Sequence, residues 1–548
     1  MRVDRNTAKV VAIVLLWAVV ARTAVLHWSP YPATLDGFFY VRSVEIVGAT
    51  GHVPAPIDLD RVVMTGFLAV ARAVLGVAPL DLLQPLSAVL GVGPVLAGIV
   101  LVRRTVGDAH GVSVGQARVG VALAGGVLAV EGLFVRRTGV PDEELLGLFF
   151  VPLVAYTFHR WLRTEQLQWG IATSIVLTVL PATHSLSTTV ALGTLGTIAV
   201  VHTSAEWRRS VLIRSFGGVL IGGAWAGSYY WLALESPGVT VSYTGRLLAS
   251  PGLLSAWMVL LAVGVVWFVR TSARIQRAIV GVLLMSWIGV LGVNLTVPVY
   301  SRTMPTPPLV LVLTLPLAGV VVTAALGIDR VADRSASGAA VLGLFVAPVV
   351  LVNYFLTAGV SPDLFGALLR VQTFAHLPVA VIAGILAATR FVGSTGASES
   401  VRWRRWGRVS FAVVLLCAVV TVPLGVMALD TATIPGTTTP QAFAGAGFAA
   451  TQVEGAWASD DQVRRVSGLY YGGNARLDPV AGWSRGGSAP DVPVLATPAW
   501  TDHGIHQYPR SPAQIDENRF DEWHATGQVV YTTGGPGTDG PYFLVVPA

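Results

Sequence analysis

The chain has 548 residues, of which 53% are hydrophobic and only 12% are charged, and its formal net charge is +6. An ordinary soluble domain carries roughly 25% charged residues, so this composition excludes a soluble globular protein. Repeated apolar runs of about 20 residues have the length of helices that cross a bilayer. The fold class predicted from these runs is an all-α polytopic membrane protein.

The absence of several well-known sequence motifs argues against several classes of function. The chain has one cysteine, Cys417, inside an apolar run, which excludes a disulfide framework or a thiolate metal site within one chain. The sequence contains no P-loop, dinucleotide-binding fingerprint, HExxH pair or Gly-x-Ser-x-Gly turn. We therefore predict no nucleotide cofactor and no nucleic-acid partner.

About thirteen apolar runs are predicted to span the membrane. The first follows a basic amino terminus, but it is longer than a signal-peptide core and lacks a small-residue cleavage site, so we expect an uncleaved span. Only three residues separate the fifth and sixth runs, so counts of twelve and fourteen remain alternatives. The runs centre on residues 10–27, 82–102, 117–134, 145–161, 169–183, 186–203, 215–234, 252–270, 278–298, 308–327, 337–357, 375–390 and 409–428.

Arginines concentrate in alternate loops, and the positive-inside tendency makes those loops cytoplasmic. The amino terminus is then cytoplasmic, and an odd number of spans puts residues 430–548 outside the cell membrane. This tail begins with a Thr- and Pro-rich connector, Thr431 to Pro440, and from Asp430 onward it carries 12 acidic and 6 basic residues. Short β-like runs within it predict a small α/β domain. The expected division is a transmembrane domain, 1–429, and an extracytoplasmic domain, 430–548.

The first outer loop, residues 28–81, carries Asp36 followed by Phe38, Phe39 and Tyr40. A carboxylate among aromatic side chains is partly desolvated, which raises its affinity for protons and suits it to act as a general base. The alternative is an aspartate that only caps a helix.

The second outer loop, residues 135–144, holds Asp142 and Glu144 two positions apart, with Glu143 between them. Hard carboxylate oxygens at this spacing suit Mg²⁺ or Mn²⁺ bound together with a substrate phosphate. Acids directly after Pro141 also fit the first turn of a helix, and that alternative stays open. The neighbouring Arg136 and Arg137 are candidate phosphate ligands.

Three further residues of predicted outer loops are weaker candidates for substrate binding, the arginines among them as ligands of an anionic lipid head group. They are His184, Arg302 and Arg370. Each also has an ordinary interpretation, as a structural histidine or as arginines that extend towards lipid head groups.

The two acidic loops resemble those of the GT-C class of polytopic glycosyltransferases, and most of all those of the oligosaccharyltransferase catalytic subunit. Asp36, Phe39 and Arg42 stand at the positions of the family's first-loop motif, and Arg137-Thr138-Gly139 followed by Asp142 and Glu144 matches the second. The resemblance implies a GT-C fold with Asp36, Asp142 and Glu144 as catalytic residues. It also implies that the same three acids bind the metal, if a metal is needed, and that Arg42 contributes to the substrate site.

The sequence departs from that subfamily in two places. The acceptor-recognition motif WWDYG is missing from residues 430–548, and the fifth outer loop is reduced to Tyr300–Pro305. The resemblance then implies an inverting transfer of a sugar from a polyprenyl- or dolichyl-phosphate carrier at the outer membrane face. The acceptor would be a glycan, a lipid-linked glycan or a protein, as in protein glycosylation or cell-envelope synthesis. The alternative from another class is a flippase or transporter of lipid-linked glycan.

Overall fold

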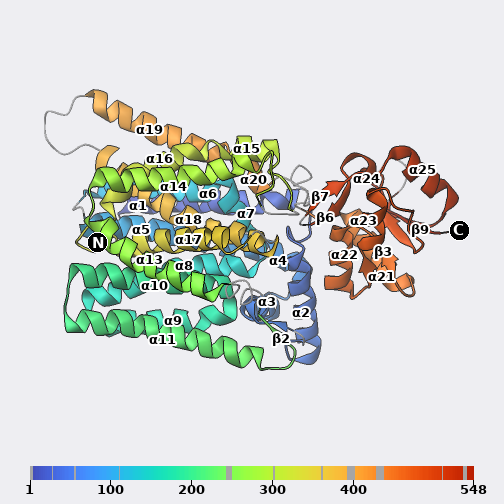
Figure 1. The fold of residues 1–548 in the computed structure, drawn as a ribbon, viewed down its shortest axis with the longest axis horizontal. Helices are drawn as coiled ribbons and strands as arrows, with labels where there is room; N and C mark the ends of the chain where they lie inside the picture. The colour runs from blue at the N-terminus through green and yellow to red at the C-terminus, as the bar shows by residue number, and fades with distance from the viewer. Residues whose placement is uncertain are drawn as a thin grey trace.

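Two parts make up the protein, a large helical bundle and a smaller mixed α/β domain at one end of it (Figure 1). The computed structural model describes residues 4–27, 29–54, 57–109, 112–241, 250–299, 303–359, 362–391, 401–426, 437–508, 510–534 and 540–547. The predicted connector, Thr431–Pro440, lies for the most part outside these described residues.

In the described part of the chain, eleven helices are long and apolar enough to cross a membrane, or twelve if the bent pair α6 and α7 counts as one span. The fifth predicted run, 169–183, forms a shorter apolar helix, α9, and this helix accounts for the difference from the prediction of about thirteen spans. The helices of the bundle are α1 (Arg5–Thr23), α4 (Pro79–Leu90), α5 (Val92–Ala109), α6 (Val114–Val130), α7 (Gly132–Gly139), α8 (Glu143–Thr164), α9 (Leu167–Thr183), α10 (Ser185–Ala205), α11 (Arg209–Leu234), α13 (Pro251–Arg270), α14 (Ala273–Val293), α15 (Pro308–Thr314), α16 (Leu317–Gly327), α17 (Ala339–Thr357), α18 (Pro362–Leu386), α19 (Val401–Val419) and α20 (Pro423–Val426).

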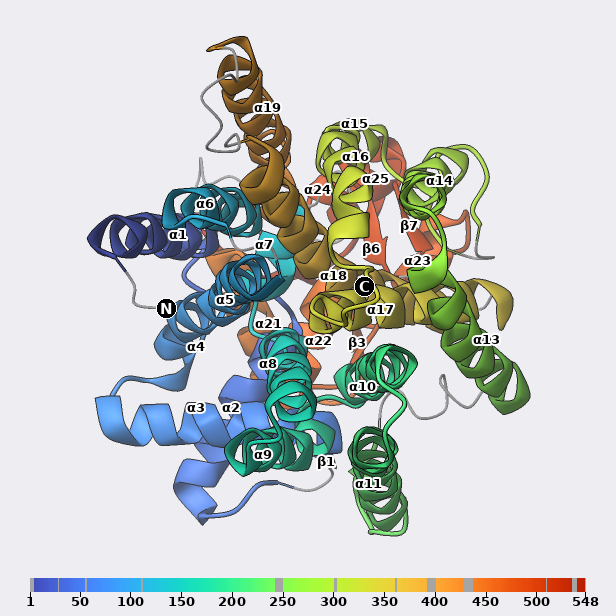
Figure 2. The ribbon, with the colours of Figure 1, turned by 90° about the vertical axis from the view of Figure 1, so that its left-hand side faces the viewer.

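The centre of the bundle is formed by α17 and α18, whose apolar segments are mostly buried. Figure 2 looks along the bundle and shows α1, α11, α13 and α19 around its edge. These outer helices expose large apolar side chains such as Trp17, Leu232 and Val263. An exposed apolar surface of this kind needs a hydrocarbon surrounding, as expected for a membrane protein.

A bend of 67° separates α6 from α7, and buried charged side chains satisfy the backbone on both sides of it. Arg22 of α1 donates to the carbonyl oxygens of Leu128 (3.3 Å) and Ala129 (3.4 Å), at the end of α6. Glu131 accepts from the N–H groups of Leu133 (2.9 Å) and Phe134 (3.0 Å), which open α7. These bonds supply the partners that helix ends lose when the chain turns inside a low-dielectric interior.

Close packing fixes the same bend from the other side. The N–H of Gly132 donates to the Thr421 hydroxyl at 2.8 Å, at the start of the segment that leads into α20. A Cβ atom at Gly132 would lie 1.8 Å from the Thr421 carbonyl oxygen, so only glycine allows this approach.

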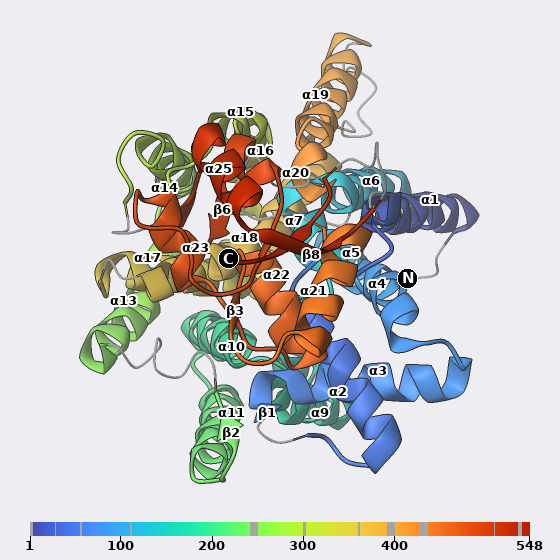
Figure 3. The ribbon, with the colours of Figure 1, turned by 90° about the vertical axis from the view of Figure 1, so that its right-hand side faces the viewer.

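The first outer loop contains two helices, α2 (Asp36–Thr50) and α3 (Val62–Leu75), joined by β1 (Ile57–Asp58) and the short 3-10 turn η2 (Leu59–Arg61). Figure 3 looks onto this end of the molecule and shows α2 and α3 beside the soluble domain. β1 pairs in parallel with β2 (Val239–Thr240), which ties the first outer loop to the segment after α11.

The carboxy-terminal part confirms the predicted small α/β domain. Its main sheet has five strands in the order β4-β3-β5-β9-β8, in which β3 runs parallel to β4 and β5, and β9 runs antiparallel to β5 and β8. A separate hairpin pairs β6 with β7. The elements are α21 (Pro440–Gln452), β3 (Trp457–Ala458), α22 (Asp461–Val466), η6 (Ser467–Tyr471), β4 (Ala475–Arg476), α23 (Asp478–Ser484), β5 (Val494–Ala496), α24 (Ala499–Asp502), β6 (Ile505–Gln507), β7 (Arg510–Ala513), α25 (Glu517–Thr526), β8 (Gln528–Thr532) and β9 (Phe543–Val546).

Replacing Arg22 by methionine should destabilise the protein by about 3 kcal/mol, because buried carbonyl oxygens at the bend lose their donors while side-chain volume is kept. The measurement is the thermal unfolding midpoint of the purified protein in detergent. Lys9→Met is the matched control, because Lys9 lies on the same helix and is exposed. Equal midpoints for the two variants would contradict the role given to Arg22.

Candidate functional site

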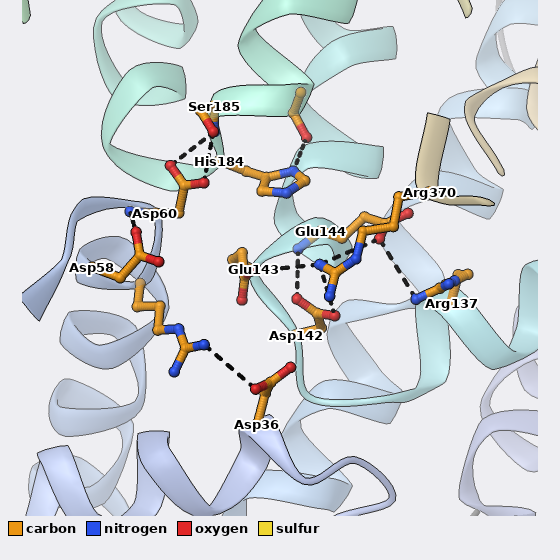
Figure 4. A network of polar contacts seen from close by, with 12 residues as sticks. Asp36, Asp58, Asp60, Arg137, Asp142, Glu143, Glu144, His184, Ser185 and Arg370 are labelled. Carbon is orange, nitrogen blue, oxygen red and sulfur yellow. Dashed lines mark hydrogen bonds and ion pairs between the residues drawn. The ribbon is translucent and has the colours of Figure 1, made fainter. Parts of the chain in front are cut away.

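The predicted acidic loops meet where the bundle joins the soluble domain (Figures 1 and 4). The second loop ends in a helix start, as the alternative interpretation of its acids proposed. Asp142 has extended backbone angles, and its carboxylate accepts from the N–H of Glu144 at 3.4 Å, so it is the N-cap of α8. Glu143 and Glu144 occupy the first turn, where the helix dipole favours negative charge.

These three carboxylates are buried, with exposed fractions of 3%, 5% and 0% for Asp142, Glu143 and Glu144. Buried charges require partners, and two arginines supply them. The Arg370 guanidinium, from α18, lies 3.5 Å from Asp142, 3.7 Å from Glu143 and 3.9 Å from Glu144. Arg137, from α7, lies 3.8 Å from Glu144.

The charge of Arg370 has a direct effect on Asp142. Burial alone would raise the pKa of Asp142, but attraction to Arg370 holds that pKa well below its ordinary value. Asp142 is therefore ionised over the whole physiological pH range. Asp142 thus supplies a fixed negative charge beside Arg370, and Glu144 lies between the guanidinium groups of Arg370 and Arg137.

Asp36 is the first residue of α2, but its carboxylate makes no capping hydrogen bond to this helix. It pairs with two arginines, Arg61 at 3.4 Å and Arg465 at 3.0 Å, and both reach the same oxygen, Oδ1. The guanidinium of Arg61 also lies 4.4 Å from the centre of the Phe39 ring. The capping alternative for Asp36 therefore does not describe its contacts.

One turn further along α2, Tyr40 connects Asp36 to the second loop. Its buried hydroxyl donates to the carboxylate of Glu143. Residues four apart lie on the same face of a helix, so Asp36 and Tyr40 both face the acids of α8. This bond fixes the distance between the two predicted catalytic loops.

A second group of buried polar side chains lies next to the acids and connects the first outer loop to α10. Asp60 accepts from the N–H of Ser185 at 2.9 Å and from its hydroxyl at 2.7 Å, so a carboxylate of the first loop caps α10 (Figure 4). His184 is fully buried and its Nδ1 lies 2.7 Å from the Ser187 hydroxyl. Burial, together with the charge of Arg370, lowers the pKa of His184 to about 3, so its ring is neutral.

An apolar pocket opens beside the cluster, and Arg136 and Arg137 lie on its wall. Arg137 belongs to both places, because it also pairs with Glu144. Apolar side chains from α14, α17 and α18 contribute to the lining, and so does Tyr508 of the soluble domain. A second apolar pocket shares Leu133, Trp287, Leu291, Gln372 and His376 with the first and extends it between the helices.

The structure therefore brings together five of the predicted residues, namely Asp36, Asp142, Glu144, Arg137 and Arg370. Arg136 lies in the adjoining pocket, and His184 is buried behind the acids without an exposed surface. Arg42 points elsewhere, because it is half exposed and pairs with Glu45 at 3.6 Å. Arg302 lies outside the described residues.

The predicted metal-binding set of Asp36, Asp142 and Glu144 is not assembled. Among the residues that the structure describes, no group of three or more His, Cys, Asp and Glu side chains is arranged to hold a metal ion. Arginines lie against all three acids in the described structure. A divalent ion bound by these acids stays a prediction.

Sequence reasoning missed several members of the site. Tyr40 could have been found, because it stands four residues after Asp36 on a predicted helix face. Arg61 and Asp60 belong to the first outer loop, but nothing in their spacing marks them. Arg465 is 429 positions from Asp36, and no local pattern in the sequence indicates that they meet.

Comparison with known proteins shows the fold. No protein-family model matches this sequence, and no curated protein matches it. Among solved structures, the archaeal oligosaccharyltransferase AglB from Archaeoglobus fulgidus, in complex with an inhibitory peptide and a dolichol-phosphate, is similar over 87% of this chain. The TM-score is 0.50, the identity is 14%, and the chain spans 64% of the length of AglB.

A second similar structure is the arabinofuranosyltransferase AftD from Mycobacteria, with a TM-score of 0.50 and 12% identity over 100% of this chain and 40% of AftD. ArnT from Cupriavidus metallidurans bound to undecaprenyl phosphate aligns with a TM-score of 0.48 at 12% identity, over 98% of this chain and 97% of ArnT. The chain has the GT-C-like polytopic membrane fold that its two loop motifs led us to expect.

Asp60 should make stability depend on pH. Burial raises the pKa of Asp60 to about 7, against an ordinary value near 4. From about pH 4 to 7 the folded state keeps a proton that the unfolded state has released, so stability falls as pH rises, by roughly 1.4 kcal/mol per unit. Above pH 7 this contribution is fully lost.

In Asp60→Asn the side chain does not titrate and still accepts from the Ser185 N–H. Thermal midpoints measured between pH 5 and pH 8 should therefore fall less with pH in this variant than in the wild type. Asp81→Asn, which removes an exposed acid, should follow the wild type. Parallel curves for all three proteins would show that Asp60 is not the titrating group.

Proposed function

We propose that this protein is a membrane glycosyltransferase that moves a sugar from a polyprenyl- or dolichyl-phosphate carrier to an acceptor hydroxyl. One observation carries the proposal: Arg137 is shared between a buried acidic cluster and an apolar pocket. A site with this composition suits a substrate that has a long apolar tail, an anionic phosphate and a polar sugar.

The pocket supports the carrier's place in the site. A prenyl chain would lie against the apolar side chains of α14, α17 and α18, with its phosphate at Arg136 and Arg137. Guanidinium groups pair with phosphate oxygens through two parallel hydrogen bonds, which gives position as well as affinity. AglB, which has a similar fold, was solved with a dolichol-phosphate bound, and that is consistent with a carrier of this class.

The reaction that follows is a direct displacement with inversion. The acceptor oxygen bonds to the anomeric carbon from the face opposite the phosphate, and the proton of that hydroxyl moves to the carboxylate of Asp36. The bond between the anomeric carbon and the phosphate oxygen breaks, and its electron pair stays on the phosphate. Arg136 and Arg137 stabilise the charge that develops there.

Asp142 and Glu144 act through the arginines in this scheme. Their carboxylates hold Arg370 and Arg137 in place before the substrate arrives, so little reorganisation is needed as charge moves to the phosphate. In this scheme Arg370 and Arg137 provide the positive charge, and no divalent ion is needed. The predicted orientation, with this end of the bundle outside the cell, would make the acceptor an outer-face glycan, lipid-linked glycan or protein.

Asp36→Asn should lower sugar transfer by about 100-fold or more, because an amide does not accept the acceptor's proton. The measurement uses purified protein in lipid with labelled polyprenyl-phosphate sugars and extracted lipid-linked glycans. Asp142→Asn should also lose most transfer, and Asp491→Asn, an exposed acid of the soluble domain, should keep it. Movement of labelled lipid across the bilayer, without transfer from any donor, would contradict the enzyme and favour a flippase.

Chelation should leave the reaction intact. After treatment with EDTA the transfer rate should stay within about twofold of the untreated rate. Arg370→Lys should lower it by about tenfold or more, because lysine keeps the charge but its shorter side chain does not place a nitrogen where Nη1 of Arg370 contacts three carboxylates. Loss of activity in EDTA and its return with Mg²⁺ or Mn²⁺ would instead support the metal-dependent mechanism that the sequence suggested.

A further inference from the structure

The soluble domain reaches into the site through one side chain. Arg465, from the short helix α22, pairs with Asp36 at 3.0 Å, a distance within the range of a charge-assisted hydrogen bond. The other partner of Asp36, Arg61, comes from the first outer loop. The predicted base is thus held between the membrane domain and the soluble domain.

The position of Arg465 is fixed from behind. Asp460 caps α22 by accepting from the Val463 N–H at 2.9 Å, and its other oxygen accepts from the Trp500 indole at 3.1 Å. Both Asp460 and Trp500 are buried. A helix anchored in this way to the core of its own domain carries Arg465 as a rigid support.

The two domains are also joined around this contact by packing. Phe38, two residues after Asp36, is fully buried in an apolar cluster of the soluble domain and stacks on Phe443 with the ring centres 5.6 Å apart. Tyr470 donates to Glu45 of α2 at 3.0 Å. Phe38 and Glu45 lie on the side of α2 opposite Asp36, so the soluble domain packs against that side of the helix and reaches Asp36 itself through Arg465.

The contacts of Asp36 suggest why two arginines would matter for its role as a base. Both arginines contact Oδ1, which leaves Oδ2 as the oxygen that takes the acceptor's proton. A partial rotation of the carboxylate about its Cβ–Cγ bond would turn this oxygen away from the acceptor. A second guanidinium on Oδ1, from a different direction, opposes that rotation.

We propose that Arg465 is a positioning residue for Asp36, and that the soluble domain thereby completes the active site of the membrane domain. This inference rests on the proposed glycosyl transfer. Catalysis then requires the guanidinium of Arg465 at Asp36, and the mere presence of an attached soluble domain is not sufficient.

The experiment compares Arg465→Ala with Arg464→Ala in the full-length protein in lipid. Arg464 is the matched control, because it stands on the same helix and carries the same charge but pairs with Asp461. Arg465→Ala should lower kcat by about tenfold or more while the KM for the donor changes by less than about twofold, because a misplaced base slows the chemical step. Arg464→Ala should retain the wild-type kcat.

Chemical rescue separates positioning from a structural effect. The Arg465 side chain is 30% exposed, so a free guanidinium ion can reach the space left in Arg465→Ala. Millimolar guanidinium should restore a substantial part of kcat in this variant and leave the Arg464→Ala rate unchanged. Tyr470→Phe, which loses a bond between the domains without touching Asp36, should keep its activity.

The possible outcomes separate this inference from the proposed function. If the wild type transfers sugar and Asp36→Asn does not, but Arg465→Ala equals Arg464→Ala, only the role of Arg465 is overturned. A fall in Arg465→Ala that guanidinium does not reverse and that Tyr470→Phe shares would also overturn it. If the wild type transfers no sugar, the proposed function fails, and the role of Arg465 in catalysis fails with it.

Discussion

The bend between α6 and α7 is the constraint on which the rest of the site depends. A chain that turns inside hydrocarbon leaves carbonyl and N–H groups without partners, and such groups are costly there. Arg22 supplies donors to the end of α6, and Glu131 supplies an acceptor to the start of α7. The bend sets the direction of α7, and this places Arg137 beside the first turn of α8.

The acids at the start of α8 have a structural role and also belong to the proposed active site. Asp142 starts α8 as its N-cap, and it also orients Arg370. Both roles need an ionised carboxylate near a helix N-terminus, where the dipole favours negative charge. The structure shows the helix start, and the same geometry is compatible with the proposed catalytic role.

Periodicity and composition were sufficient to predict the bundle, the soluble domain and the two acidic loops, because burial in lipid imposes long apolar runs that are visible in the sequence. The predicted span count differed because α9 is short. Within the site, Asp36, Asp142 and Glu144 were found from their loops, whereas their arginine partners come from distant elements. Arg370 was placed in an outer loop, but it lies within α18, which begins earlier than its apolar stretch indicates.

The arginine partners of the acids show why local sequence was not enough. Two acids at close spacing have the same appearance in the sequence whatever their partner is, and Arg370, which contacts them, belongs to a helix more than 200 positions away. Arg465 makes the point more strongly, since it reaches Asp36 from another domain. Long-range ion pairs of this kind convert a pair of loop motifs into a single buried site, and they also make the soluble domain part of that site. A membrane domain alone would leave Oδ1 of Asp36 with one arginine in place of two.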